Sequence, residues 1–164
     1  MALRTIRIAG DPVLEKACRE VTEITPKLSE LIDDMFETMY DAGGVGLAAP
    51  QVGNLRRIVV IDCGEEMGGP YVLINPVITL KEGEQTGDEG CLSLPGKVGT
   101  VTRPEHVIVE ALDRDMKPVT VEAHGLLARA VCHECDHLEG HMYMELAEEG
   151  TLRDISYDDE DEED

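Results

Sequence analysis

Apolar residues recur every three or four positions between Thr25 and Gly43, which is the spacing of one face of an α-helix. The buried stripe would consist of Leu28, Leu31, Ile32, Met35, Phe36 and Met39. Thr25 is a suitable N-cap, Pro26 fits the first helical position, and Gly43 and Gly44 end the pattern. The segment therefore predicts an N-terminal amphipathic helix whose methionines pack in a core.

Further along the chain the hydrophobic pattern changes to short runs rich in β-branched residues, which are typical of strands. Four such runs cover residues 57–62, 71–80, 106–112 and 119–123. Asn75-Pro76 interrupts the second run, and the last two flank a polar loop from Asp113 to Pro118, which predicts an antiparallel hairpin. Residues 125–139 return to a helical pattern that ends at Gly140.

Several strands with one helix before them and one after them indicate an α+β fold. We expect antiparallel sheets packed around the second helix, which is then central. The 164 residues are enough for one domain with a sizeable core. We place a single catalytic domain at residues 1–156 and a disordered, acidic tail at residues 157–164.

The composition excludes several classes of partner. The formal net charge is −21, and such a chain lacks the clustered Lys and Arg that nucleic acid or an anionic membrane requires. No segment approaches the roughly 20 apolar residues of a membrane span. Five cysteines, an odd number, indicate reduced thiols. We therefore expect a cytoplasmic protein with no direct DNA binding and no membrane association.

The candidate chemistry is concentrated in the second helix, where HECDH occupies residues 133–137. His133 and His137 are four residues apart, so a helix places them on one face, one turn apart. Two neutral imidazoles in this arrangement bind zinc or a similar cation. Glu134 lies about 100° round the helix from His133, where it can handle the protons of a water without ligating the metal.

A catalytic site of this type needs a third protein ligand. The extended HExxH pattern would place a histidine at 143, but the residue is Tyr143. Glutamates at 145, 148 and 149 follow the end of the helix at Gly140 too closely for the chain to bring them back to the two histidines easily. Cys91, which follows Gly90, is the other candidate because metal binding would itself deprotonate its thiol. A buried, inert cysteine remains the alternative for a single thiol.

Three motifs together resemble those of bacterial peptide deformylases: GVGLAAPQ at 44–51, EGCLS at 89–93 and HECDH at 133–137. The resemblance extends from RIAGDPVL at residues 7–14 to about residue 146. It implies a metal-dependent hydrolase that removes the formyl group from formyl-methionyl nascent polypeptides and releases formate. It also implies the same α+β fold with antiparallel sheets around the HExxH helix.

The resemblance implies a role for each motif. Cys91, His133 and His137 would bind one divalent metal ion, with Fe²⁺ favoured and Ni²⁺, Co²⁺ or Zn²⁺ able to replace it. Glu134 would take a proton from a metal-bound water and later deliver one to the departing amine. The resulting hydroxide would attack the formyl carbon. The Gln51 amide and the Leu92 backbone N–H would stabilise the charge on the formyl oxygen.

The substrate would lie extended beside small residues, as an added strand. By resemblance, Val45 and Gly46 face Gly90 across this path, and Val45 and Leu126 bound an apolar pocket for the Met side chain. Arg129 shares the helix face of His133; it would flank the pocket mouth or, as we favour, reach solvent.

Some residues depart from the family pattern or have no assigned partner. Cys132 stands where the family usually has Gln, and with Cys135 it makes a C-x-x-C spacing that is a poor fit to a redox pair. The chain also lacks the longer, basic C-terminal helix of many bacterial members, so ribosome docking is reduced to transient contact. The remaining histidines are expected to be surface or structural residues: His106, His124 and His141.

Two competing interpretations remain. The first is an HExxH peptidase that cuts internal amide bonds, and the second is a non-catalytic metal-binding module. Cys91→Ala separates the first from a deformylase, because a peptidase with a glutamate ligand would keep its metal. Glu134→Ala tests the second, because only a catalyst loses turnover when that carboxylate is removed.

Overall fold

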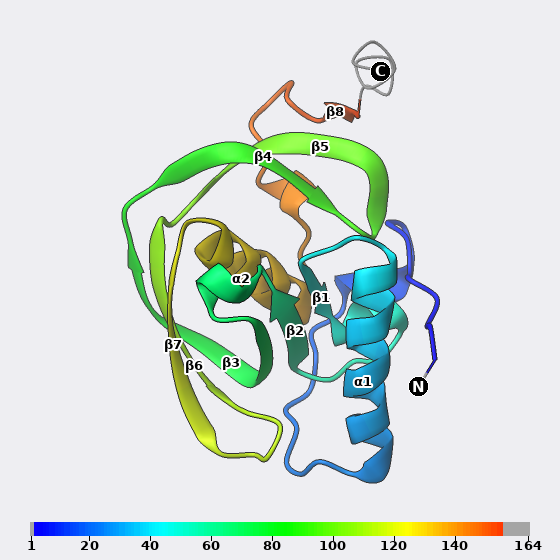
Figure 1. Cartoon of the computed structure of the whole chain (residues 1–164). Coiled ribbons are helices and arrows are strands. Elements are labelled where there is room, and N and C mark those ends of the chain that lie inside the picture. The colour runs from blue at the N-terminus through cyan, green and yellow to red at the C-terminus, as the bar shows by residue number, and fades with distance from the viewer. Residues whose placement is uncertain (1, 156–164) are drawn as a thin grey trace.

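Two antiparallel sheets and two α-helices make up the main part of the structure that a computed structural model describes, residues 2–155 (Figure 1). The predicted tail at 157–164 and the last residue of the predicted domain, 156, lie outside the described residues. The helices are α1 (Pro26–Asp41) and α2 (Gly125–Leu138). The strands are β1 (Gly46–Ala48), β2 (Ile58–Asp62), β3 (Pro70–Glu82), β4 (Gln85–Cys91), β5 (Leu94–Arg103), β6 (His106–Leu112), β7 (Pro118–His124) and β8 (Arg153–Asp154).

The larger sheet has the order β1-β2-β3-β6-β7, and the smaller has the order β4-β5-β8. Every neighbouring pair in both sheets is antiparallel. The prediction of an α+β fold with antiparallel sheets is therefore confirmed. Figure 1 shows β4 and β5 arching over one end of α2, while α1 stands on the other side of β1 and β2.

Strand β2 is buried on both of its faces, and its side chains alternate between two hydrophobic clusters. Val59 and Ile61 pack in the cluster that contains Leu127, Val131 and other residues of α2. Ile58 and Val60 pack in the cluster that contains Leu31, Ile32, Met35 and Met39 of α1. The two helices consequently cover opposite faces of the larger sheet, which explains the continuous apolar run at this strand.

The ends of both helices follow the expected local chemistry. The Thr25 hydroxyl accepts a hydrogen bond from the Leu28 N–H at 3.2 Å, as an N-cap should. Helix α2 starts directly after β7 at Gly125, whose φ of 55° lets the chain turn from strand to helix. This connection, without an intervening loop, ties the position of α2 to the last strand of the larger sheet.

The chain departs from the predicted strands in two places. Residues 71–80 belong to one continuous strand, because Asn75 adopts a φ of 52° within a β-bulge instead of ending the strand. Its side chain also bonds both the N–H and the carbonyl of Val21, at 2.9 and 2.8 Å. Strands β4 and β5 are not predicted from the sequence. Charged and small residues there obscure the alternation of apolar and polar side chains that is typical of a strand.

Within residues 2–155, none of the helices has the length and apolar character needed to cross a membrane.

Candidate metal centre

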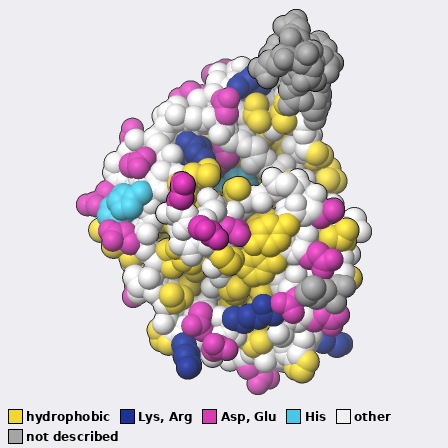
Figure 2. Space-filling model, in the orientation of Figure 1, with side chains coloured by type: hydrophobic (Ala, Val, Ile, Leu, Met, Phe, Trp, Pro, Cys, Tyr) yellow, Lys and Arg dark blue, Asp and Glu magenta, His cyan; other side chains and the backbone are white. Residues whose placement is uncertain are grey.

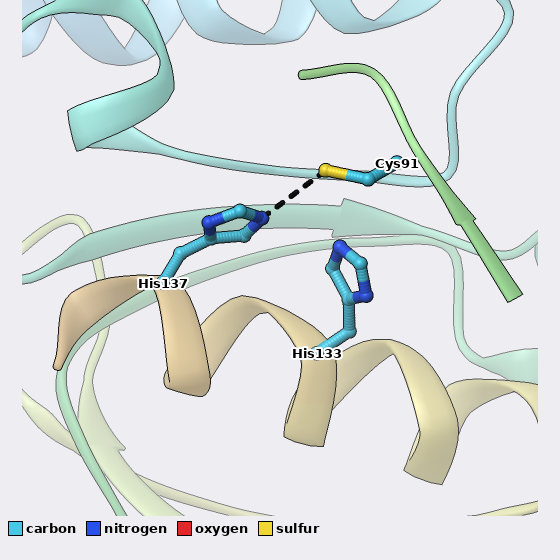
Figure 3. A group of neighbouring side chains, drawn as sticks. All are labelled: Cys91, His133 and His137. Carbon is cyan, nitrogen blue, oxygen red and sulfur yellow. Dashed lines mark hydrogen bonds between the residues drawn. The ribbon is translucent and has the colours of Figure 1, made fainter. Parts of the chain in front are cut away.

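Cys91, His133 and His137 come together at one point, although the cysteine and the first histidine are 42 positions apart in the chain (Figure 3). One ligand atom of each lies within 4.8 Å of the others. The Cys91 sulfur is 3.3 Å from His137 Nε2, and the two imidazole rings meet edge to face with centroids 5.0 Å apart. The three donors can thus face one small cation.

Two elements supply these donors. His133 and His137 project from α2 one turn apart, as the helical spacing predicts. Cys91 is the last residue of β4, where the pairing with β5 shifts between Glu89 and Cys91. A shift of this kind changes which way a side chain points. Figure 3 shows the thiol directed toward the histidine-bearing face of α2.

Glu89 fixes the orientation of His133 from behind. Its Oε2 lies 2.7 Å from Nδ1 of His133, and the Arg103 guanidinium donates to both carboxylate oxygens, at 3.1 and 2.6 Å. Burial alone would raise the pKa of Glu89, but the hydrogen bonds from His133 and Arg103 lower it to about 2. The charged carboxylate therefore holds His133 with Nε2 toward the donor cluster.

Arg129 does not reach solvent, so the favoured sequence prediction for this residue is wrong. Its Nη1 donates to Glu89 Oε1 at 3.0 Å, and its Nη2 donates to the Val101 carbonyl at 3.2 Å. Only 9% of the residue is exposed. The buried Glu89 carboxylate explains why the Arg129 guanidinium points inward, because a buried charge without paired partners would be costly.

His137 and Glu134 each have one buried polar atom that finds no hydrogen-bond partner among the described residues, Nδ1 and Oε1 respectively. Burial, together with the nearby positive charge of His133 and Arg103, lowers the pKa of His137 to about 3. Its ring is consequently neutral, which is the form that binds a metal. Burial raises the pKa of Glu134 to about 7. A carboxyl with that pKa can both take and give a proton near neutral pH.

Gly46 on β1 leaves room for the Glu134 carboxyl. A Cβ at this position would lie 2.6 Å from Oε2 of Glu134 and 3.0 Å from its Cγ. Neither approach is possible for a real side chain without movement. The glycine therefore allows the strand to pass directly against the functional end of Glu134.

Gln51 is held with its amide nitrogen toward the cysteine. Its Oε1 accepts from the Ala48 N–H at 2.9 Å, which fixes the amide, and Nε2 donates to Ser93 Oγ at 3.1 Å. The same Nε2 lies 3.6 Å from the Cys91 sulfur. Gln51 is 1% exposed, so packing also restrains the donor.

A cavity of about 570 Å³ opens beside this cluster. Its lining includes every residue that the sequence analysis assigned to the substrate: Val45, Gly46, Gly90 and Leu126. Leu92, Gln51 and Glu134 line it as well. Figure 2 shows a hollow on this face, with apolar side chains around it and histidine atoms visible inside. His137 does not line the cavity and is buried beneath it.

Comparison with known protein families shows which family this chain belongs to. A family model for polypeptide deformylase matches residues 3–151. The chain belongs to the peptide deformylase family. A peptide deformylase of Agathobacter rectalis is 64% identical over 159 residues, covering 97% of this chain and 98% of the relative. One from Lachnoclostridium phytofermentans is 61% identical over 163 residues, covering 99% and 100%.

Solved peptide deformylase structures are similar to this chain in fold. That of Legionella pneumophila has a TM-score of 0.86 and 44% identity, covering 90% of this chain and 88% of the other. A structure from Ehrlichia chaffeensis in complex with actinonin has a TM-score of 0.86 and 36% identity, covering 91% of both chains. The likeness therefore extends over nearly all of the described residues.

The residues present in this chain fit a divalent metal ion, which the family uses. A thiol and two imidazoles form a donor set for borderline-soft divalent cations. The Glu89 carboxylate lies 2.7 Å from Nδ1 of His133, an arrangement that commonly orients histidine ligands of metals. The donor cluster thus has the chemistry to hold the ion.

Glu89 belongs to the EGCLS motif but has no role predicted from the sequence, and Arg103 carries no prediction, although both hold the site together. Both are among the least exposed charged residues of the described chain, at 6% and 4%. The sequence does contain a sign that Arg103 is buried. Arg103 lies two residues after the apolar Val101, so on a strand the two side chains share one face. An arginine on a buried face requires a buried acid as partner.

Cys132 and Cys135 are free thiols rather than a disulfide. Cys132 lies in the aliphatic cluster beneath α2, and Cys135 packs against the same cluster. Burial raises the pKa of Cys132, and it raises that of Cys135 to about 12. Both thiols are therefore protonated and unreactive at neutral pH.

Proposed function

We propose that this chain removes the N-terminal formyl group from formyl-methionyl nascent polypeptides and releases formate. Membership of the peptide deformylase family supports the activity. The observation that carries the proposal is the meeting of all three sequence motifs at one cavity. Gln51, Cys91 and His133 come from different motifs, and all of them line it.

Cys91, His133 and His137 would hold one divalent ion, with Fe²⁺ the leading candidate and Ni²⁺, Co²⁺ or Zn²⁺ as substitutes. Their mutual distances and burial support this role. When bound, such an ion would act as a Lewis acid toward the attacking water and the formyl oxygen. The ligand set itself does not select among these metals.

Glu134 would transfer the protons. Its Oε2 lies 3.9 Å from Nε2 of His133, so the carboxyl is next to the donor cluster without being one of the three donors. The carboxylate would take a proton from the attacking water and later deliver it to the departing amine nitrogen. A pKa of about 7 suits both directions of transfer.

Gln51 and Leu92 would stabilise the developing charge on the formyl oxygen. The Gln51 amide is pre-oriented by Ala48 and points its donor toward Cys91. Leu92 follows Cys91 in the chain and lines the same cavity, so its backbone N–H is the second donor of this proposal. Donors that are already aligned need no reorganisation when the charge forms.

The peptide would bind in an extended form between β1 and β4. Each of these strands is the outermost of its sheet within residues 2–155, so both have an edge available for strand addition. Gly46 lies on β1 and Gly90 on β4, and both line the cavity. Val45 and Leu126, 40% and 44% exposed, offer apolar surface for an unbranched Met side chain.

The wider organisation follows from the same proposal. We place the catalytic domain at residues 1–156, with the sheets arranged around α2, and an acidic tail at residues 157–164. Contacts of α2 with β1, β2, β5, β6 and β7 support its central position. Nascent chains are the substrate, so the protein would work in the cytoplasm and would make transient contact with the ribosome.

Formate release from formyl-Met-Ala-Ser tests the activity. Protein purified without oxygen and reconstituted with Fe²⁺, Ni²⁺ or Zn²⁺ should release formate, whereas internal amide bonds of the peptide should stay intact. Glu134→Ala should abolish turnover with the metal content unchanged, and Cys91→Ala should lose the metal. No formate with any of the three ions, or full turnover by Glu134→Ala, would overturn the proposal.

A further inference from the structure

A second cluster of histidines and carboxylates lies on the face of the larger sheet opposite the one that α2 covers. His106 is directly opposite His124 in the pairing of β6 with β7, and Glu82 is directly opposite His106 in the pairing of β3 with β6. These positions share one face because directly paired residues point the same way. From the sequence, these histidines are expected to be surface or structural residues without assigned partners.

The cluster faces solvent rather than the metal centre. Val107 and Ala123, the next residues on each strand, point into the core beneath α2. Side chains alternate along a strand, so His106, Glu122 and His124 point the opposite way. Glu82 and Glu122 have 61% of their side chains exposed. Figure 2 shows histidine side chains flanked by acidic ones on the side of the molecule formed by β6 and β7.

The donors in this cluster are close together. His106 Nδ1 lies 2.8 Å from Glu82 Oε1, and its Nε2 lies 2.7 Å from Glu122 Oε2. The rings of His106 and His124 stack with centroids 4.3 Å apart and planes 2° apart. One ligand atom each of His106, Glu122 and His124 lies within 4.8 Å of the other two.

We propose that His106, Glu122 and His124 form a second site for a divalent cation of the Zn²⁺, Co²⁺ or Ni²⁺ class. Two imidazoles and one carboxylate are a common donor set for these ions. Glu82 supports the site by holding Nδ1 of His106, which leaves Nε2 as the ligand atom. Two carboxylates and two neutral imidazoles around one divalent ion give a cluster with no net charge.

The required rearrangement falls on two exposed side chains, Glu122 and His124. Ligand atoms on one tetrahedral cation at about 2.0–2.2 Å are about 3.5 Å from each other. Nε2 of His106 and Oε2 of Glu122 are closer than this, so the cation would separate them by rotating the exposed Glu122 side chain. His124 would turn about its own Cα–Cβ bond to bring one nitrogen beside them.

The proposed site lies where a bound cation could stabilise the start of α2. His124 is the last residue of β7 and the N-cap residue of α2, which begins at Gly125. A cation bound there would fix the start of the helix that carries HECDH to the neighbouring strand β6. We expect it to raise the melting temperature of the protein, because a ligand bound only by the folded state stabilises that state.

Metal counting in the holoenzyme tests the site independently of deformylation. Protein with its catalytic metal is dialysed against micromolar Zn²⁺, and bound metal is measured by elemental analysis. Wild type should take up one further equivalent, while His106→Ala and His124→Ala should not. His141→Ala is the matched control: His141 is exposed and its Nδ1 lies 3.2 Å from Glu145 Oε1, and its loss should leave the uptake unchanged.

The Glu122→Gln variant tests the site even if the histidine variants fold poorly, because it keeps the side-chain size at an exposed strand position. It should weaken Zn²⁺ binding at least tenfold while formate release and circular dichroism match wild type. In the Co²⁺ form, wild type should add a second set of visible absorption bands that His124→Ala lacks. No further equivalent in wild type, or equal loss in His141→Ala and His124→Ala, would overturn the proposal.

Discussion

The Glu89 carboxylate lies 2.7 Å from Nδ1 of His133, on the side of the ring away from the donor cluster. The pair is buried, and the guanidinium groups of Arg103 and Arg129 complete the carboxylate's hydrogen bonds. This contact selects which nitrogen of His133 faces Cys91 and His137. The metal centre therefore depends on a residue that contributes no donor to it.

Replacing Glu89 should weaken metal binding without removing a ligand. Glu89→Gln keeps the shape but loses the charge that two arginines and His133 share, so the His133 ring is less well oriented. We expect a 10–100-fold loss of metal affinity, the usual effect of removing such a partner. Competition with a coloured chelator measures it. Glu110→Gln, on an exposed position of β6, is the control and should bind metal like wild type.

Gly46→Ala should damage catalysis more than metal binding. The added Cβ would lie 2.6 Å from Oε2 of Glu134, a buried carboxyl that has little space to move. A displacement of about 1 Å at a catalytic group can cost about 100-fold in rate. Steady-state formate release and metal content should be measured together. Gly87→Ala, whose Cβ would meet only Arg129 Nη2 at 3.5 Å, should behave like wild type; equal losses in both variants would contradict the steric explanation.

Two ion pairs of equal length should contribute very differently to stability. Arg103 and Glu89 are 2.6 Å apart with each side chain 4% exposed, whereas Arg153 and Asp88 are 2.6 Å apart with 49% and 55% exposed. Arg103→Met removes two hydrogen bonds and one of two arginines from the buried Glu89 carboxylate and should cost about 3–5 kcal/mol. Arg153→Met should cost no more than about 1 kcal/mol. Urea unfolding at the same metal loading compares them, and similar midpoints would show that burial does not govern these pairs.

Asp34 should make the free energy of unfolding depend on pH in the acidic range. Burial would raise its pKa, but hydrogen bonds from the Ala2 N–H and Arg4 Nε lower it below 3.8. A folded-state pKa below the unfolded value adds stability above that value, and this stability is lost as the pH falls through the folded pKa.

The Asp34→Asn variant should therefore be less stable than wild type at pH 7. The difference should shrink as the pH falls below 3.8, the ordinary value of the carboxyl. Urea unfolding at a series of pH values measures this difference. The exposed Asp41→Asn variant is the control, and a constant gap between Asp34→Asn and wild type at all pH values would exclude the proposed linkage.

Helix α1, the β6–β7 hairpin and the extent of α2 were predictable because local rules govern them. Caps, turn residues and hydrophobic periods act over a few residues, and no distant contact overrides them here. Strands β4 and β5 were not predictable, because Gly, Asp, Glu and Lys in them pair through the backbone and through buried ion pairs rather than through apolar faces. The bulge at Asn75 was hidden for a similar reason, since Val21, 54 residues away, satisfies its side chain.

The sequence by itself determined the two histidines on one helix face, the adjacent glutamate and the three motifs, because helical spacing and residue chemistry are local. Only the tertiary structure decided that Cys91 reaches His137, that Arg129 turns inward to Glu89, and that His106 meets His124 across two strands. These relationships depend on strand register and on the charge balance of a buried site. Both arise from contacts between residues far apart in the chain, which no local pattern contains.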